Sequence, residues 1–508
     1  MTASSDIFIV GGGINGVGMA ADAASRGLSV TLCEKNDIAS GTSSASTKLI
    51  HGGLRYLENF EFSLVRKALR EREILWHNAK HIISPLEFIL PWDKKFRPAW
   101  FIRCGLFIYD HLTWNSSFPR SRKIKLSEDV RGKALQSRFK TGFSYFDCMT
   151  DDARLTLLNA IAAKEQGATL LTQTTFLSAK FSNNRWQIQL KANNTDQIFT
   201  YYATALVNAA GPWINQVQNR IENEKKFDVN LVKGSHIIVR KLYEGHFAYL
   251  LQNPDKRIIF AIPYQNEFTL IGTTDVCYTE DIDHVKISPD EIRYLCDTIN
   301  YFFKHPVKLT ESDVIFSYAG VRCLLADDVK NPAKISRDYH VHSSESLPLL
   351  TVLSGKITTY RRLAEESIEK LRPFFPQMKK SKTQHTPLPG GDFFAGDFSR
   401  FCEKALSDYS WLPEKIVARY TKNYGTRMHM LLDNATSLAD LGKHFGHTLY
   451  QNEVNYLIQY EWARTAEDIL WRRTKLGLLF SADECRELEN YTSKFLIGEI
   501  LWQKHPLQ

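Results

Sequence analysis

The glycines within residues 11–16 could bind a phosphate group. They form the pattern G-x-G-x-x-G, in which Gly11 permits a tight turn, Gly13 lets the backbone approach a pyrophosphate and Gly16 lets a helix pack closely on a strand. Glu34 follows about 20 residues later, where a carboxylate accepts a hydrogen bond from a ribose 2′-hydroxyl and repels a 2′-phosphate. This spacing predicts a bound dinucleotide, FAD or NAD rather than NADP.

The chain around these glycines has the elements that such a site needs. The apolar run Ile7–Val10 predicts a buried parallel strand, the alanine-rich stretch Ile14–Arg26 a tightly packed helix, and Leu28–Leu32 a second strand. Because the motif lies at the extreme N-terminus, we favour FAD over NAD. A second small-residue turn, Ala209–Pro212, ends another predicted strand and could run close to a flavin, although an ordinary strand-ending turn has the same pattern.

Basic side chains near glycine turns could bind an anionic substrate. Arginine forks and lysine point charges suit phosphate, although most of the 64 Lys and Arg residues are expected on the surface. Four places in the chain offer such side chains, three of them close behind a glycine: Arg55 with Tyr56, Arg322, Arg337, and Lys356.

Two residues could handle the proton of an oxidised hydroxyl. His236 titrates near neutrality and suits a general base, although a buried structural histidine is an equally good interpretation. Arg322 is always protonated, so it suits stabilisation of a developing alkoxide better than proton abstraction.

Composition sets the class of protein. The chain has 508 residues and a formal net charge of +8, and about three domains are expected for this length. The small excess of charge does not indicate nucleic-acid binding but leaves a phosphorylated substrate or an anionic membrane open. We find no signal peptide, no apolar run long enough to span a bilayer and no metal-ligand or disulfide spacing among the eight cysteines, so we expect no bound metal and reduced thiols.

Taken together, these motifs resemble the FAD-dependent, membrane-associated glycerol-3-phosphate dehydrogenases of bacteria. The matching stretches run in family order over nearly the whole chain: 11–30, 42–58, 97–112, 151–155, 207–213, 233–239, 271–276, 336–339, 355–365 and 469–478. The resemblance implies that glycerol 3-phosphate is oxidised at C2 to dihydroxyacetone phosphate, that FAD takes the hydride, and that reduced FAD passes its electrons to a membrane quinone.

The same resemblance implies roles for particular residues. It places Arg322 beside the C2 oxygen, and it surrounds the substrate with Arg55, Tyr56, Thr273, Arg337 and Lys356. On chemical grounds we assign His236 as the base and Arg322 as the stabilising charge. The residues expected to bind FAD are Gly11, Gly13, Ile14, Asn15, Gly16, Glu34, Thr42, Ser43, Ser44, Ser46, Lys48, Leu49, Ala210, Gly211, Gly355 and Thr358. The chain departs from the family at Cys323, where proline is common, and at Ser354, where glycine is common; the second change removes a permissive backbone position beside Lys356.

The segment 97–125 interleaves bulky aromatic and basic residues. Such a segment suits insertion into an anionic membrane surface without spanning it, whereas packing against the protein core is the alternative. The family's habit favours the membrane, and with it a cytoplasmic protein bound peripherally to the inner face of the cell membrane. The resemblance also leads us to expect a homodimer.

Two other functions compete with the dehydrogenase. A glycerophosphate oxidase that reduces oxygen would share every motif, although the large insertion expected before its C-terminal part is absent. A non-enzymatic FAD scaffold or sensor would need no anion clamp. An amine-oxidising relative would share the flavin domain but would not react with glycerol 3-phosphate.

We expect an α/β fold. A Rossmann-type FAD-binding domain is predicted from residues 1–75, 147–225 and 320–385, interleaved with an antiparallel-sheet substrate domain from 76–146 and 226–319. A C-terminal all-helical domain is predicted over 399–508, after a linker at 376–398 that is rich in Pro, Gly, Lys and Ser.

Overall fold

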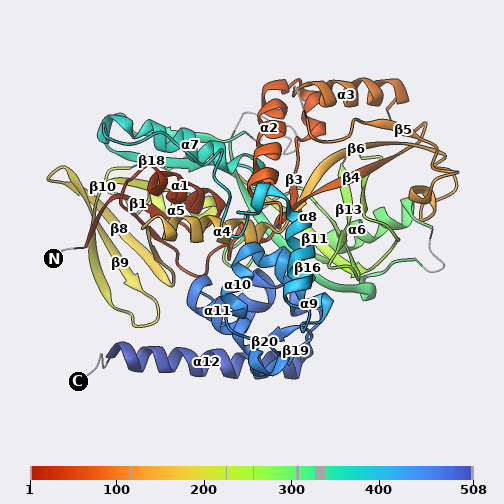
Figure 1. Ribbon diagram of the computed structural model, residues 1–508. Coiled ribbons are helices and arrows are strands. Elements are labelled where there is room, and N and C mark those ends of the chain that lie inside the picture. The colour runs from red at the N-terminus through yellow and green to blue at the C-terminus, as the bar shows by residue number, and fades with distance from the viewer. Residues whose placement is uncertain are drawn as a thin grey trace.

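The computed structural model describes residues 3–95, 97–113, 116–224, 226–255, 257–304, 308–326 and 338–504, the last ten of these by their backbone alone. Two large sheets and a helical C-terminal domain make up the molecule (Figure 1). The α/β class, the second, mostly antiparallel sheet and the helical C-terminal domain predicted from the sequence are all present.

The first sheet contains β1, the strand directly before the glycine motif. Its strand order is β17-β18-β10-β1-β2-β7, extended by the antiparallel strands β8 and β9. Strand β1 is parallel to both of its neighbours, as its continuous apolar run predicts. The bounds are β1 Ser4–Val10, β2 Val30–Cys33, β7 Thr169–Leu171, β8 Thr174–Ser182, β9 Arg185–Ala192, β10 Ile198–Asn208, β17 His340–Ser343 and β18 Leu349–Leu353.

Helices cover this sheet. Helix α1 (Ile14–Ser25) packs between α4 (Asp152–Glu165) and α7 (Tyr360–Lys370), and the three share one hydrophobic core with β1 and β2. The short helix α5 (Ile214–Gln218) contributes to a separate core together with the β8–β9 hairpin. The carboxyl ends of β1 and β10 therefore meet at one edge, beside the start of α1, which is where ligands bind in open parallel sheets.

The second sheet is mostly antiparallel and has the order β15-β11-β14-β13-β12-β4-β6-β3, with β16 paired to β11 and β5 to β6. Its bounds are β3 Leu49–Ile50, β4 Ile83–Trp92, β5 Arg122–Ile124, β6 Thr141–Thr150, β11 Val229–Arg240, β12 Phe247–Gln252, β13 Ile258–Tyr264, β14 Phe268–Gly272, β15 Val276–Cys277 and β16 Val314–Leu325. Strand β16 crosses position 320, the predicted domain boundary, so the strand that carries Arg322 lies in the substrate sheet.

The two faces of the second sheet are covered differently. Helix α6 (Pro289–Phe302) shares a core with residues such as Ile237 on one face. Helices α2 (Phe62–Asn78) and α3 (Ala99–His111) share a core with Ile238 on the other. Because side chains alternate along a strand, Gly234 and His236 lie on the same face as Ile238, and His236 contacts Thr47 of the loop before β3.

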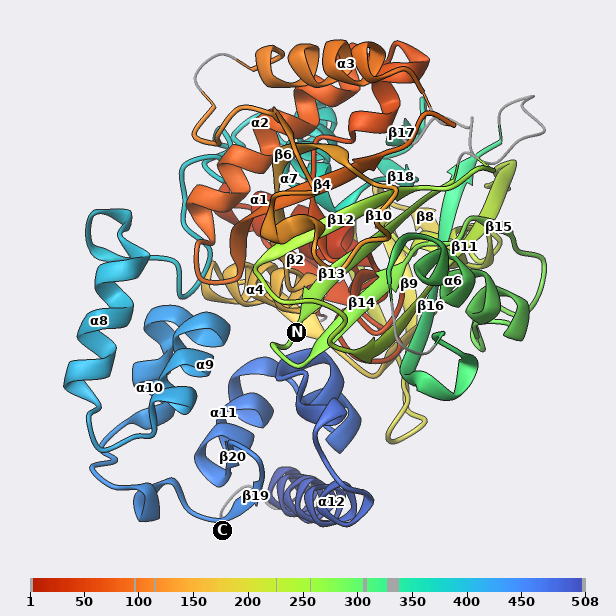
Figure 2. The same cartoon turned by 90° about the vertical axis from the view of Figure 1, so that its right-hand side faces the viewer.

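The C-terminal domain lies at the opposite end of the molecule from α3 in both views (Figures 1 and 2). It contains α8 Phe398–Asp408, α9 Glu414–Tyr424, α10 Met428–Leu432, α11 Gln451–Glu461 and α12 Ala482–Lys504, together with a hairpin of β19 His444–Gly446 and β20 Leu449–Tyr450. One core of its own holds these helices together.

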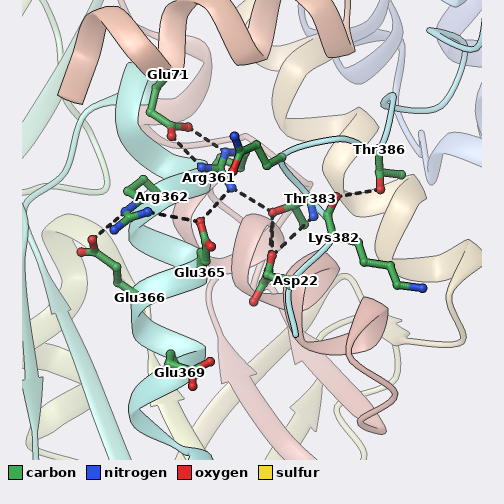
Figure 3. Close-up of polar contacts among 12 residues, drawn as sticks. Asp22, Glu71, Arg361, Arg362, Glu365, Glu366, Glu369, Lys382, Thr383 and Thr386 are labelled. Carbon is green, nitrogen blue, oxygen red and sulfur yellow. Dashed lines mark hydrogen bonds and ion pairs between the residues drawn. The ribbon is translucent and has the colours of Figure 1, made fainter. Parts of the chain in front are cut away.

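The segment before this domain is not a free linker. Ser381 Oγ donates to Asp22 Oδ1 at 2.5 Å, and Asn78 Nδ2 donates to the Thr383 carbonyl oxygen at 3.0 Å. Figure 3 shows Thr383 beside Asp22 and Arg361. These bonds fasten the predicted linker to α1, α2 and α7.

The C-terminal domain also contacts both sheets, at the loop after β2 and at β16. Asp37, three residues after Glu34, accepts from Arg472 Nε at 2.7 Å and from Arg473 Nη2 at 2.8 Å, and Arg473 is buried. The ring of Trp471 stacks on Phe316 of β16 with a centroid distance of 4.0 Å. Arginines of the predicted family stretch 469–478 therefore hold the loop that follows β2.

Candidate functional site

The glycine turn lies against the turn that follows β10. A Cβ atom on Gly11, whose φ is +114°, would lie 2.7 Å from the carbonyl oxygen of Ala209. A Cβ on Gly16 would lie 2.0 Å from the carbonyl oxygen of Gly11. The glycine turn, helix α1 and the turn after β10 can approach this closely only because Gly11 and Gly16 have no side chains. The glycine motif and the turn at Ala209–Pro212 therefore form one surface.

Several groups on this surface fit FAD. The half-buried Glu34 carboxylate accepts from the Gly12 N–H at 2.7 Å and from the Asn36 N–H at 2.9 Å, and it has lone pairs left for a ribose hydroxyl. Helix α1 begins after Gly13, which has no side chain to cap it, so the N-terminal N–H groups beyond that of Ile14 suit a pyrophosphate. Asn15 Oδ1 is buried with no hydrogen-bond partner among the described residues, which is a position for a ligand donor.

The predicted flavin loop uses much of its polarity on its own shape. Thr42 Oγ1 donates to the Val321 carbonyl oxygen at 2.6 Å, and Ser43 Oγ accepts from the Ile14 N–H at 2.9 Å. Ser46 Oγ and Lys48 Nζ both donate to Asp152, each at 2.7 Å. Ser46 and Lys48 therefore fix the loop to α4. Ser44 ends the short 3₁₀ turn Thr42–Ser44 of this loop, and Leu49 begins β3, which follows it.

Sequence reasoning missed the role of Asp152. Its two oxygens bind the loop residues, and the charge of Lys48 is the largest influence that lowers the pKa of this buried carboxyl. The signal was present, because Asp151-Asp152 begins the matching stretch at 151–155. Asp151 is the N-cap of α4 and pairs with Lys475 at 3.1 Å, so only its neighbour faces the loop.

His236 lies on β11, on the face toward the flavin loop. Its ring stacks on Tyr318 of β16 at 4.9 Å, and its Nε2 lies 3.0 Å from Thr47 Oγ1. Burial lowers the pKa of His236 well below its usual range, and the nearby charges of Lys48 and Arg322 lower it further. The imidazole is therefore neutral near pH 7, the form that can accept a proton.

Arg322 and Thr273 meet over Gly234. A Cβ on Gly234 would lie 2.5 Å from Arg322 Nη2 and 2.6 Å from Thr273 Oγ1. Arg322 donates to Asp275 Oδ1 at 2.9 Å, and its side chain keeps 30% of its exposure. Asp275, in the matching stretch 271–276, is a second residue that sequence reasoning missed, and it orients the guanidinium.

The other predicted substrate residues come from two turns. Lys356 Nζ lies 3.7 Å from the ring centroid of Tyr56, and Arg55 is half-buried in the same 3₁₀ turn, Leu54–Asn59. Thr358 Oγ1 accepts from the His51 N–H at 3.2 Å, so a hydrogen bond joins the segments that carry these turns. Arg337 lies outside the described residues.

The departure at Ser354 leaves a trace in the backbone. Ser354 adopts φ of +65° and Gly355 φ of +128°, so a residue with a side chain occupies the left-handed region where the family commonly has glycine. Asn15 Nδ2 donates to the Ser354 carbonyl oxygen at 3.4 Å, which places this turn against the glycine motif. Cys323 is buried in a small apolar core.

A buried ion pair connects α2 and α7, the helices that follow the turns carrying Tyr56 and Lys356. Arg361 of α7 donates to both oxygens of Glu71 of α2, at 2.6 and 2.8 Å, as Figure 3 shows. Both side chains are about 5% exposed. Lys356 and Tyr56 lie shortly before these helices, so the pair joins the two helices to which their turns lead.

The chain is similar to known proteins over nearly its whole length. Residues 6–361 match the family described as FAD dependent oxidoreductase, and residues 381–506 match the C-terminal domain of alpha-glycerophosphate oxidase. A glycerol-3-phosphate dehydrogenase of Pseudomonas aeruginosa is 47% identical over 99% of this chain and 96% of its own. A D-erythritol 1-phosphate dehydrogenase of Brucella abortus is also 47% identical, over 92% of this chain and 94% of its own. A glycerol-3-phosphate dehydrogenase of Bacillus halodurans, solved with FAD, superposes with a TM-score of 0.76 at 27% identity and covers 97% of this chain and 94% of its own.

Proposed function

Since the chain belongs to the family of FAD-dependent glycerol-3-phosphate dehydrogenases, we propose that it oxidises glycerol 3-phosphate at C2 to dihydroxyacetone phosphate. The observation that carries this proposal is the convergence of Arg322 and Thr273 over Gly234, on the sheet face that also holds the neutral imidazole of His236. A fixed positive charge beside a neutral base is the arrangement that oxidation of a hydroxyl group needs.

The roles of the residues follow from their chemistry. The substrate phosphate is bound by Arg55, Tyr56 and Lys356. Lys356 supplies positive charge, and the ring of Tyr56 holds the Lys356 ammonium group in place. His236 accepts the proton of the C2 hydroxyl, and Arg322, oriented by Asp275, stabilises the oxygen as negative charge develops on it. FAD, when bound by the glycine turn and Glu34, supplies the acceptor for the hydride from C2.

Variants of the two central residues separate their roles. His236→Ala is expected to lower kcat about 10²- to 10⁴-fold, the usual contribution of a general base. If His236→Ala keeps near-normal turnover at neutral pH while Arg322→Ala does not, the assignment of the base is wrong.

Anaerobic reduction of the bound flavin tests substrate, cofactor and reaction together. Glycerol 3-phosphate is expected to bleach the flavin spectrum, whereas a scaffold or an amine-oxidising relative would not respond. Because one relative is named for D-erythritol 1-phosphate, this compound belongs in the same titration. Faster bleaching by the longer polyol phosphate would assign the substrate differently.

We further propose that the electrons leave the protein to a membrane quinone, with α3 at the membrane surface. Trp100, Phe101 and Phe107 on α3 are 68%, 42% and 56% exposed, and Arg122 and Lys123, on β5 of the same segment 97–125, are exposed cations. Two aromatics predicted for this surface, Tyr109 and Phe118, are instead buried, so only the outer face of α3 supports the proposal. None of the described helices is long and apolar enough to cross a membrane.

Two measurements test this second proposal. Vesicles with anionic lipid are expected to co-sediment with the protein at low salt, and failure to do so would refute the membrane contact. Oxygen uptake with glycerol 3-phosphate but without added quinone would instead indicate an oxidase. The predicted homodimer stays a prediction, which light scattering in solution would check.

A further inference from the structure

Helix α3 faces in two directions. Its outer face carries the exposed aromatics, whereas Ile102, Leu106 and Tyr109 on the inner face share a core with Leu69 of α2. Tyr109 is 3% exposed and is the polar member of this inner face. Its hydroxyl therefore needs partners inside the protein.

The partners of Tyr109 belong to a carboxylate and to the turn before Arg55. The hydroxyl lies 2.7 and 2.8 Å from the two oxygens of Asp147 on β6, to which it donates. It accepts from the Gly52 N–H at 3.0 Å, and this N–H also lies 3.2 Å from Asp147. A Cβ on Gly52 would lie 2.5 Å from the same hydroxyl, so backbone and side chain are in direct contact.

The network is closed and buried. Asp147 is 1% exposed, and Arg72 of α2, 3% exposed, donates to it at 2.9 Å. Burial and the charge of Asp147 raise the pKa of Tyr109 far above its usual range, so the hydroxyl keeps its proton and remains a donor. Loss of the hydroxyl would leave the buried Gly52 N–H and Asp147 with fewer hydrogen-bond partners.

We infer that Tyr109 is a positioning residue, which sets the turn of residues 52–56 and thereby the placement of Arg55 and Tyr56 around the substrate phosphate. The inference rests on the proposed function of those two residues. Glycine at position 52 leaves this backbone without a side chain to restrict it, and the Tyr109 hydroxyl supplies the restriction instead. A residue of the surface helix α3 thus acts on substrate affinity from outside the site.

Tyr109→Phe tests the inference, because it removes only the hydroxyl. We expect the KM for glycerol 3-phosphate to rise about 5- to 10-fold while kcat changes less than about twofold, since an interaction made equally in ground and transition states changes KM alone. Flavin content should not change, because Gly52 lies outside the glycine turn. An unchanged KM would overturn the inference.

Tyr243→Phe is the matched control. Tyr243 is also buried, at 8% exposure, in the loop between β11 and β12, where its hydroxyl donates to the carbonyl oxygens of Phe247 and Ala261 far along the chain from the turn. A loss of packing alone would affect both variants similarly, lowering Tm without changing KM. A rise in KM in Tyr243→Phe equal to that in Tyr109→Phe would also overturn the inference.

A double-mutant cycle shows whether Tyr109 acts through Arg55. In an Arg55→Ala background the effect of Tyr109→Phe on KM should shrink to under about twofold, because the side chain that the turn positions is gone. Full additivity would overturn the inference. Wild-type bleaching by glycerol 3-phosphate is the separate check on the proposed function, so failures of the two are distinguishable. If Tyr109→Phe does not fold, amide hydrogen exchange of the wild-type turn with and without substrate replaces it, and an unprotected Gly52 N–H would refute the contact.

Discussion

Gly234→Ala adds one methyl group at the point where Arg322 and Thr273 converge. The new Cβ would lie 2.5 Å from Arg322 Nη2, whereas ordinary contact begins near 3.4 Å, so the guanidinium has to move by roughly 0.9 Å. The backbone itself accepts alanine, because Gly234 lies within β11 and its φ is outside the left-handed region. The substitution therefore displaces a functional group while leaving the fold in place.

The size of the effect follows from this displacement. A shift of about 1 Å in a positioned group can cost about 100-fold in rate, or about 2.7 kcal/mol of transition-state stabilisation. We expect kcat/KM of Gly234→Ala to fall by about this factor. Since the 30% exposed Arg322 side chain can move outward, the free energy of unfolding should change by less than about 1 kcal/mol.

Steady-state kinetics with glycerol 3-phosphate, flavin absorbance and urea denaturation test this reasoning together. Gly105→Ala is the matched control, because a Cβ there meets no atom within 4 Å and it lies within α3. It should keep full activity. Normal kcat/KM in Gly234→Ala, or equal loss in both variants, would show that Arg322 is not held in place for the reaction.

Three further predictions concern the cofactor, pH and the buried ion pair. Gly16→Ala places a Cβ 2.0 Å from the Gly11 carbonyl oxygen, so the purified protein should lack flavin absorbance; a normal flavin content would contradict the role of this glycine. Burial lowers the pKa of His81 to about 3, so between that value and about 6.5 only the unfolded chain binds the proton, and stability falls as pH falls below 6.5, by about 1.4 kcal/mol per unit. Urea midpoints at pH 7 and pH 5 should differ less in His81→Leu than in the wild type, and equal differences would refute this. Glu71→Gln leaves Arg361 with less compensation and should cost about 3 kcal/mol of unfolding free energy and raise KM, whereas a change in stability alone would separate the pair from the substrate turns.

Local signals made much of the cofactor side predictable. The glycine spacing, the apolar strand before it and the alanine-rich helix after it all lie within about 30 residues, so periodicity and turn chemistry describe them directly. The substrate side depends on strands distant in the chain. That Arg322 binds Asp275, and that Arg322 and Thr273 lie over Gly234, depends on the pairing of β11 with β16 and β15, which no local pattern encodes.

The segment 97–125 shows the same limit in another form. Its aromatic and basic composition suggested one amphipathic surface, but Tyr109 and Phe118 pack inward while Trp100 faces out. Composition cannot assign faces where partners come from elsewhere in the chain, here Asp147 and Gly52. Ser46 is likewise predicted from sequence only as a cofactor residue, and the fold adds that its hydroxyl donates to Asp152 of α4.

The contacts of Asp37 have a consequence for the order in which the protein matures. The loop after β2 rests on the glycine turn through the Ala39 N–H and the Gly12 carbonyl oxygen, 3.1 Å apart, and it is fixed from outside by Arg472 and Arg473. A ribosome makes the glycine turn long before these arginines. The pocket for the flavin therefore gains its outer contacts only after residues 472–473 have been synthesised, so a nascent chain that ends before them holds the cofactor less firmly than one that contains them.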